Sequence, residues 1–257
     1  MLLRRVIEHV KAQNWFAVGL DFVIVVVGVF VGLQVSNWNE ARLREQTARV
    51  YIERIRDDLA ANKEDLKQRA LYFSQTKGHA LAALTALDQP RETLGDEFLI
   101  DVYQASQILP RTFGRDTYDE ILSVGAVNAI TDVSARKMLA NFYRGAEAPL
   151  AILAQTVPYR EIVREKLPYA AQAAIRAECE EISVINDAGE PLISLPDTCE
   201  IDLSANEISQ SVSAIIDAEI HGALVRRISD LDNKVLMSQR IIERVKALDS
   251  HLEELQQ

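Results

Sequence analysis

The sequence predicts a mainly α-helical protein with one N-terminal transmembrane helix, a long antiparallel helical stalk, and a distal helical head that carries a small β-hairpin. Three observations predict this fold class: one apolar segment near the N-terminus, two long stretches with apolar residues at helical spacing, and a short β-prone segment between two cysteines. The 257 residues include only 10 glycines and 7 prolines, as is typical of helical proteins.

Residues 15–38 predict the transmembrane helix. Their centre, residues 22–33, contains no charged or polar side chain, and the whole segment reaches the ~20 residues that cross a ~30 Å hydrocarbon layer. Between Trp15 and Ser36, only Asp21 and Gln34 interrupt the apolar character, and both lie toward the ends, where water or headgroups can reach them.

Residues 1–14 form a basic leader with Arg4, Arg5 and Lys11, which we expect on the cytoplasmic side. No small-x-small cleavage site follows the apolar segment, so a retained signal anchor fits better than a removed signal peptide. Basic residues also follow the segment, and the flanks alone therefore leave the orientation open. Because a cysteine pair favours an oxidising compartment, we expect a single-pass protein with a periplasmic C-terminal domain.

Polar and aromatic residues at both ends of the segment predict the membrane interface. Trp15 and Trp38 are amphipathic rings suited to the headgroup layer. Asn37, Asn39 and Glu40 could bind lipid headgroups or backbone where the helix leaves the membrane. The alternative is a simple interface marker followed by continuing helix.

Small residues at four-residue intervals, Gly28, Gly32 and Ser36, lie on one face of the predicted transmembrane helix. Such a stripe lets two helices approach closely, which predicts a homo-oligomer formed through this helix. The alternative is the ordinary glycine content of membrane helices. Asp21 falls near the same face, but the segment offers no partner for a proton-handling role.

Two long amphipathic stretches predict the stalk. Residues 39–88 would form an ascending helix and residues 204–257 a descending one, each ~70–80 Å long and each with a coiled-coil-like apolar stripe. Asn62 and Arg69 are polar breaks in the first stripe. Equal lengths and matching stripes favour antiparallel pairing, and pairing of each helix with copies of itself is the alternative.

The segment between the stalk helices, residues 89–203, predicts the head. Helices are expected over residues 95–109, 117–124 and 132–144. Thr117 and Glu120 have the spacing of a capping box, and Gly125 would close that helix. Gly145 would end the third helix and Pro149 would start the next.

Residues 181–203 predict a β-hairpin with strands over 182–185 and 191–195. Cys179 and Cys199 flank it and belong to no zinc-binding pattern, so we expect a disulfide at its base if the segment lies outside the cytoplasm. A bridge over a loop of this size would stabilise the fold by ~3 kcal/mol. Two unrelated thiols are the alternative.

Charge and motifs exclude several functions. The net charge is −10, and residues 59–257 carry 20 basic against 31 acidic side chains, which argues against nucleic acid as a partner. No nucleotide loop, nucleophile elbow or metal-binding histidine pair occurs, so no catalytic residue, metal or cofactor is predicted. His79 and His221 lie on the two stalk helices, where they either meet or stay on the surface. If the head instead held a non-local enzyme site, its candidate cation ligands would be Asp116, Asp119, Glu120 and Asp132.

Residues 28–40, which end in Asn37-Trp38-Asn39-Glu40, resemble a family of bacterial single-span membrane proteins of unknown function with an N-W-N-E signature after the span. Residues 117–125 and Ile130, followed by Leu139 and Tyr143, are similar to the family's T-[YF]-x-E-L-x-S-x-G…I stretch and its following helix. The resemblance covers about residues 20–145. It implies a location in the bacterial inner membrane and no catalytic residues.

These observations predict a membrane-anchored envelope protein that acts as a non-enzymatic interaction or scaffold module. Its expected partners are the lipid bilayer, a second copy of the chain and another envelope protein. One alternative is a ligand-sensing extracytoplasmic domain that works through a membrane partner, because a 14-residue leader cannot hold an output module. The other is an enzyme with a non-local site in the head.

Overall fold

The computed structural model describes residues 15–155, 157–186, 189 and 191–256. Residues 1–14, and with them the predicted basic leader, lie outside the described residues. The same holds for residues 156, 187, 188, 190 and 257, and for the side chains of residues 15–19 and 21, which include Trp15 and Asp21. The described part is mostly helical with one two-stranded sheet, which confirms the predicted fold class.

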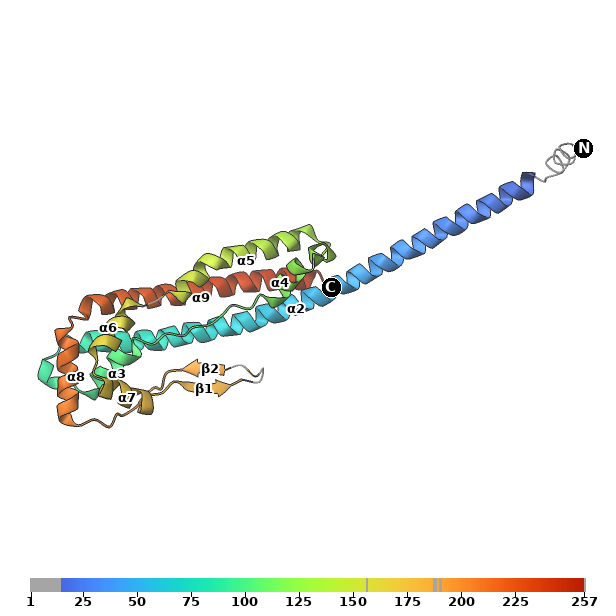
Figure 1. The fold of residues 1–257 in the computed structure, drawn as a ribbon. Coiled ribbons are helices and arrows are strands. Elements are labelled where there is room, and N and C mark those ends of the chain that lie inside the picture. Colours follow the sequence, from blue (N-terminus) through green and yellow to red (C-terminus); the bar gives the residue numbers. More distant parts are fainter. Residues whose placement is uncertain (1–14, 156, 187–188, 190, 257) are drawn as a thin grey trace, which may run out of the picture.

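Helix α2 (Trp15–Ala86) runs for 72 residues without a break, from the apolar segment to the far end of the bundle (Figure 1). The predicted transmembrane helix and ascending stalk are therefore one helix, which no proline interrupts. Described side chains are exposed as far as Thr47, and Ala48 is the first buried residue. Among the described residues, this is the one helix long and apolar enough to span a membrane.

Helix α9 (His221–Glu254) packs antiparallel against α2, as the matching apolar stripes predict (Figure 1). Fully buried leucines such as Leu59, Leu66 and Leu231 form the shared core. At the membrane-proximal end of the bundle, Arg56 of α2 donates from Nε to Oδ1 of Asp249 at 2.7 Å. The C-terminus thus returns toward the apolar end of α2.

The segment predicted as one descending helix is two helices. Helix α8 (Ala205–Asp217) lies across the distal end of the bundle, and α9 starts after a turn (Figure 1). Glu219 adopts a left-handed conformation with φ of 49° in that turn, which ends the first helix. A capping box between Ser204 and Glu207 begins α8.

The segment predicted as a distal head is divided between the far end of the bundle and its side (Figure 1). A short 3₁₀ turn η1 (Arg91–Thr93) and helices α3 (Asp96–Gln104), α6 (Pro158–Lys166) and α7 (Tyr169–Glu178) lie distally. Residues 105–115 instead run back along α2 toward α4 (Asp116–Ser123) and the 3₁₀ turn η2 (Ala126–Ala129). Helix α5 (Val133–Ala154) then returns along α9, so the stalk carries a third helix over much of its length.

Helix α5 passes through both residues that were expected to end it and to start another, Gly145 and Pro149. Pro149 has no N–H to donate to the carbonyl four residues earlier, which is that of Gly145. Arg244 of α9 donates from Nη1 to this carbonyl at 2.7 Å, so a tertiary hydrogen bond replaces the helical one.

Strands β1 (Ile182–Ile185) and β2 (Pro191–Ser194) form the predicted antiparallel hairpin, with Ile182 opposite Ser194. A disulfide joins Cys179 to Cys199 at its base, with a Cα–Cα distance of 5.4 Å. Just after β2, the backbone N–H and C=O of the buried Leu195 pair with the side-chain amide of Gln75 at 3.1 and 3.3 Å. These bonds fasten the hairpin to α2.

Candidate functional site

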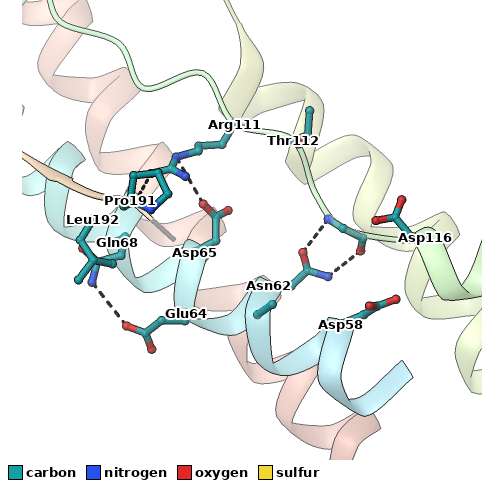
Figure 2. Close-up of a pocket in the computed structure, with 12 residues that line it drawn as sticks. Asp58, Asn62, Glu64, Asp65, Gln68, Arg111, Thr112, Asp116, Pro191 and Leu192 are labelled. Carbon is teal, nitrogen blue, oxygen red and sulfur yellow. Dashed lines mark hydrogen bonds and ion pairs between the residues drawn. The ribbon is translucent and has the colours of Figure 1, made fainter. Parts of the chain in front are cut away.

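A cleft of about 300 Å³ lies where the returning segment crosses α2 beside β2 (Figure 2). Three stretches of chain that are far apart in sequence form its walls. They are residues 58–68 of α2, residues 111–116, and the start of β2 at Pro191 and Leu192. The side chains that line the cleft include four carboxylates, those of Asp58, Glu64, Asp65 and Asp116.

Asn62 holds the returning segment at the centre of the cleft (Figure 2). Its Nδ2 donates to the carbonyl of Gly114 at 2.6 Å, and its Oδ1 accepts from the Gly114 N–H at 2.8 Å. A Cβ on residue 114 would lie 3.3 Å from this oxygen, so glycine permits the close approach. Asn62, the polar break in the apolar stripe of α2, thus supplies hydrogen-bond partners to the backbone of this extended segment, which pairs with no described strand.

Asp65 joins all three walls of the cleft. It accepts a hydrogen bond from Nε of Arg69 at 2.6 Å, and Nε of Arg111 lies 3.7 Å from its other oxygen. Arg69 also donates to the carbonyl of Thr112 at 2.9 Å, and Arg111 donates to that of Pro191 at 2.6 Å. Two guanidinium groups therefore contact the Asp65 carboxylate. Its role is to hold the walls together, and it adds little free negative charge to the cleft.

The predicted capping box at the start of α4 is not formed. Asp58 of α2 accepts a hydrogen bond from the Thr117 N–H at 3.1 Å, so a neighbouring helix supplies the cap. Glu120 forms a bidentate ion pair with Arg54, and this hydrogen bonding lowers the pKa of the Glu120 carboxyl. The backbone N–H of Thr117 and the side chain of Glu120 thus contact α2, which sequence spacing alone does not reveal.

The four acidic residues considered as cation ligands do not converge. Asp116 lines the cleft, Asp119 pairs with Arg115 at 2.8 Å, and Glu120 pairs with Arg54. Asp132 caps α5 by accepting from the Ala135 N–H at 2.6 Å. In the described parts of the chain, no group of three or more His, Cys, Asp or Glu side chains could hold a metal ion. These four residues, the candidate cation ligands of the enzyme alternative, therefore do not form one site.

The two stalk histidines do not meet either. Nδ1 of His79 lies 2.8 Å from Oδ1 of Asp101, while His221 is exposed at the start of α9. This pairing joins α2 to α3.

The lining of the cleft determines what it can bind. Its lining residues carry no histidine, cysteine, serine or tyrosine, whereas carboxylates outnumber the single guanidinium of Arg111. Glu64 is half-buried, and its hydrogen bond from Lys67 lowers the pKa of its carboxyl group, while Asp116 is exposed. The arrangement suits a cationic side chain that enters between Asp58, Glu64 and Asp116.

The residues predicted to meet the membrane lie on the part of α2 outside the bundle (Figure 1). A Cβ added at Gly28 or Gly32 would meet no atom within 4 Å. Ser36 and the interface residues 37–40 are exposed, and Trp38 keeps 66% of its surface. The described chain therefore leaves this stretch uncovered.

Sequence reasoning missed Asp58 and Arg111 as residues of the cleft. Asp58 stands in a charged stretch of the predicted stalk helix, Arg111 stands in the loop after the helix predicted over 95–109, and neither carries a spacing signal. Comparisons of the chain with protein-family models, curated proteins and solved structures find no match.

Proposed function

We propose that this chain is a membrane-anchored envelope protein that acts as a non-enzymatic interaction or scaffold module. The observation that carries this proposal is the unbroken helix α2, which contains the apolar segment and also forms the core of the bundle. A partner bound to the bundle is then coupled to the anchor through one stiff element. The N-W-N-E resemblance supports a bacterial membrane, and the cysteine pair supports the periplasmic side.

The distance between anchor and bundle supports a display role. Between Trp38 and Ala48 the exposed helix spans ~15 Å. This neck carries charged side chains, Glu40, Arg42, Arg44 and Glu45. The bundle would thus stand above the headgroups, where it can reach another envelope protein without burying its surface in lipid.

The acid-lined cleft is our candidate contact surface for that partner. Its carboxylates face an opening formed by three elements, and a lysine or arginine of a partner protein would complement them. Anchoring both proteins in the same membrane raises their effective concentration, so a modest interface suffices for association.

Site-specific photo-crosslinking in intact cells tests this function. A photoreactive amino acid at Ala61, exposed on the cleft wall, should give discrete crosslinked species. The same residue at Ala247, equally exposed on α9, is the matched control. Changing Glu64→Gln and Asp116→Asn together should abolish the products from Ala61. Equal products from both positions, or none from either, would contradict the proposal.

A second candidate function, ligand sensing, is favoured by a cavity of about 160 Å³ that lies against α2 at Arg69 and Phe73. A ligand there would touch the same helix that enters the apolar segment, so binding could bias the helix position.

A further inference from the structure

This cavity lies between α2, residues 108–111, the end of α5 and α9. Its inner wall carries the side chains of Arg227 and Lys234, while the exposed residues Ala154 and Gln155 line its rim. A cavity of about 150 Å³ accommodates a molecule the size of benzene. The space therefore suits a ligand whose buried part is about the size of a benzene ring.

Arg227 is 1% exposed, although guanidinium groups almost always keep contact with water or a carboxylate. Its Nε donates to the carbonyl of Ala105 at 2.9 Å, and one terminal nitrogen donates to that of Gln107 at 2.6 Å. The other terminal nitrogen, Nη1, is buried without a hydrogen-bond partner. The end of α3 thus positions this cation but leaves one of its donors unused.

Lys234 lies two turns further along α9 and is 5% exposed. Its Nζ donates to the carbonyl of Leu153 at 2.8 Å and lies 3.4 Å from that of Gln155, so it caps the end of α5. The ammonium also stands 5.5 Å from the centre of the Phe73 ring. Carbonyls and an aromatic face stabilise a cation, but they do not neutralise it.

The positive charges that line the cavity are not balanced by nearby carboxylates. Among the described residues, neither Arg227 nor Lys234 has an ion pair within 4 Å, and Asp230, between them on α9, attracts both from farther away. Arg69 and Arg111 also line the cavity, and they share Asp65. Burial lowers the pKa of Lys234 to about 8 and that of Arg227 to about 10, because the charged forms lack solvent.

The rest of the lining is apolar. Phe73, Leu109 and Leu153 are buried, and Ile108 and Pro110 complete that side. Along α2, the cavity is ~50 Å from Trp38, which places it beyond the reach of headgroups of the same membrane. A soluble ligand is therefore required.

We infer that this cavity is a binding site for a small organic carboxylate, with the carboxylate held between Arg227 and Lys234 and a short apolar part against Phe73, Leu109 and Leu153. The free Nη1 donor and the third ammonium proton would bond the carboxylate oxygens. Inorganic phosphate would satisfy the charges but leave the apolar wall unused. This site does not depend on the interaction function, because the acid-lined cleft lies on other residues.

Isothermal titration of the full chain in lipid nanodiscs tests the inference with benzoate as the probe. We expect one benzoate per chain, at least tenfold weaker binding of the uncharged isostere benzamide, and weaker binding of inorganic phosphate. Lys234→Gln should weaken benzoate binding at least tenfold. Lys246→Gln, the same change at an exposed site on α9, should leave it unaltered.

A second variant guards against misfolding of Lys234→Gln. Gln155→Glu places a negative charge at the exposed rim and should weaken benzoate binding several-fold while benzamide is unaffected. Absence of benzoate binding to the folded wild-type chain, equal binding of benzamide, tighter binding of phosphate, or equal losses in Lys234→Gln and Lys246→Gln would each overturn the inference.

Discussion

Arg244 of α9 donates to the Gly145 carbonyl that Pro149 leaves without a helical partner, and this single contact explains why α5 continues through a glycine and a proline. Gly145 also leaves room for the guanidinium, because a Cβ there would collide with it. The two residues that resemble a helix boundary thus form a docking point between helices.

This relationship predicts energetic coupling between Arg244 and Pro149. In the wild type, Arg244→Met should destabilise the fold by ~1 kcal/mol, because the Gly145 carbonyl loses its donor. In a Pro149→Ala background the alanine N–H bonds that carbonyl, so Arg244→Met should cost less. Chemical denaturation of the four proteins measures the coupling, which we expect at ~0.5–1 kcal/mol. Arg240→Met, an exposed change on α9, is the control, and purely additive effects would refute the account.

Local spacing predicts the elements of this chain better than their arrangement. Apolar periodicity predicts α2 and α9, because each buries one regular face. The hairpin is predicted instead by the turn residues between its two β-prone segments, and all four residues of β1 are exposed. The path of residues 105–131 along α2 was not predictable, since it depends on Asn62, Asp58 and Arg54 meeting backbone and acids 50 or more residues away. Such contacts leave no periodic trace in the sequence.

For the substitution Asn62→Leu, apolar periodicity and the structure predict opposite changes in stability. Leucine would complete the apolar stripe of α2, so periodicity alone predicts a neutral or stabilising change. The structure instead predicts a loss of ~2 kcal/mol, because the N–H and carbonyl of Gly114 lose their partners beside a mostly buried side chain. The midpoint of urea unfolding checks this. Gln68→Leu, at the same cleft but bonded only within α2, should change it by less.

Breaking the disulfide should weaken the distal part of the bundle. Cys179 is buried, and its carbonyl accepts a hydrogen bond from Nε2 of Gln104 at 2.9 Å, so the bridge is attached to α3. Replacing Cys179 and Cys199 by serine should lower the free energy of unfolding by ~3 kcal/mol, measured by urea unfolding.

The same disulfide predicts that protein extracted without reductant resists maleimide until it is unfolded and reduced. Immediate labelling of the native protein would argue against a periplasmic bundle.

Lys234 predicts how stability depends on pH. Its folded pKa of about 8 is below the ordinary lysine value of 10.5, so between these pH values the unfolded chain holds a proton that the folded chain lacks. Stability from this group is therefore lowest below pH 8 and rises with pH through that window. Asp230 moderates the effect and Arg227 strengthens it. From pH 8 to pH 9.5, Lys234→Gln should gain ~1–2 kcal/mol less than Lys246→Gln, measured by urea unfolding. Parallel pH profiles would show that Lys234 stays charged in the fold.

The open face at Gly28 and Gly32 predicts association of the apolar segment. Apart from the adjoining residues and backbone of the same helix, no atom of the described chain lies within 4 Å of a Cβ at either position, so a second helix can approach the backbone closely there. Changing both glycines to isoleucine should weaken association in bilayers at least several-fold, because the side chains hold the backbones apart. Energy transfer between labelled chains in vesicles measures this. Val27→Ile with Val31→Ile keeps the same spacing on a neighbouring face and should have little effect. Equal energy transfer in all three proteins would mean that these glycines do not form the contact.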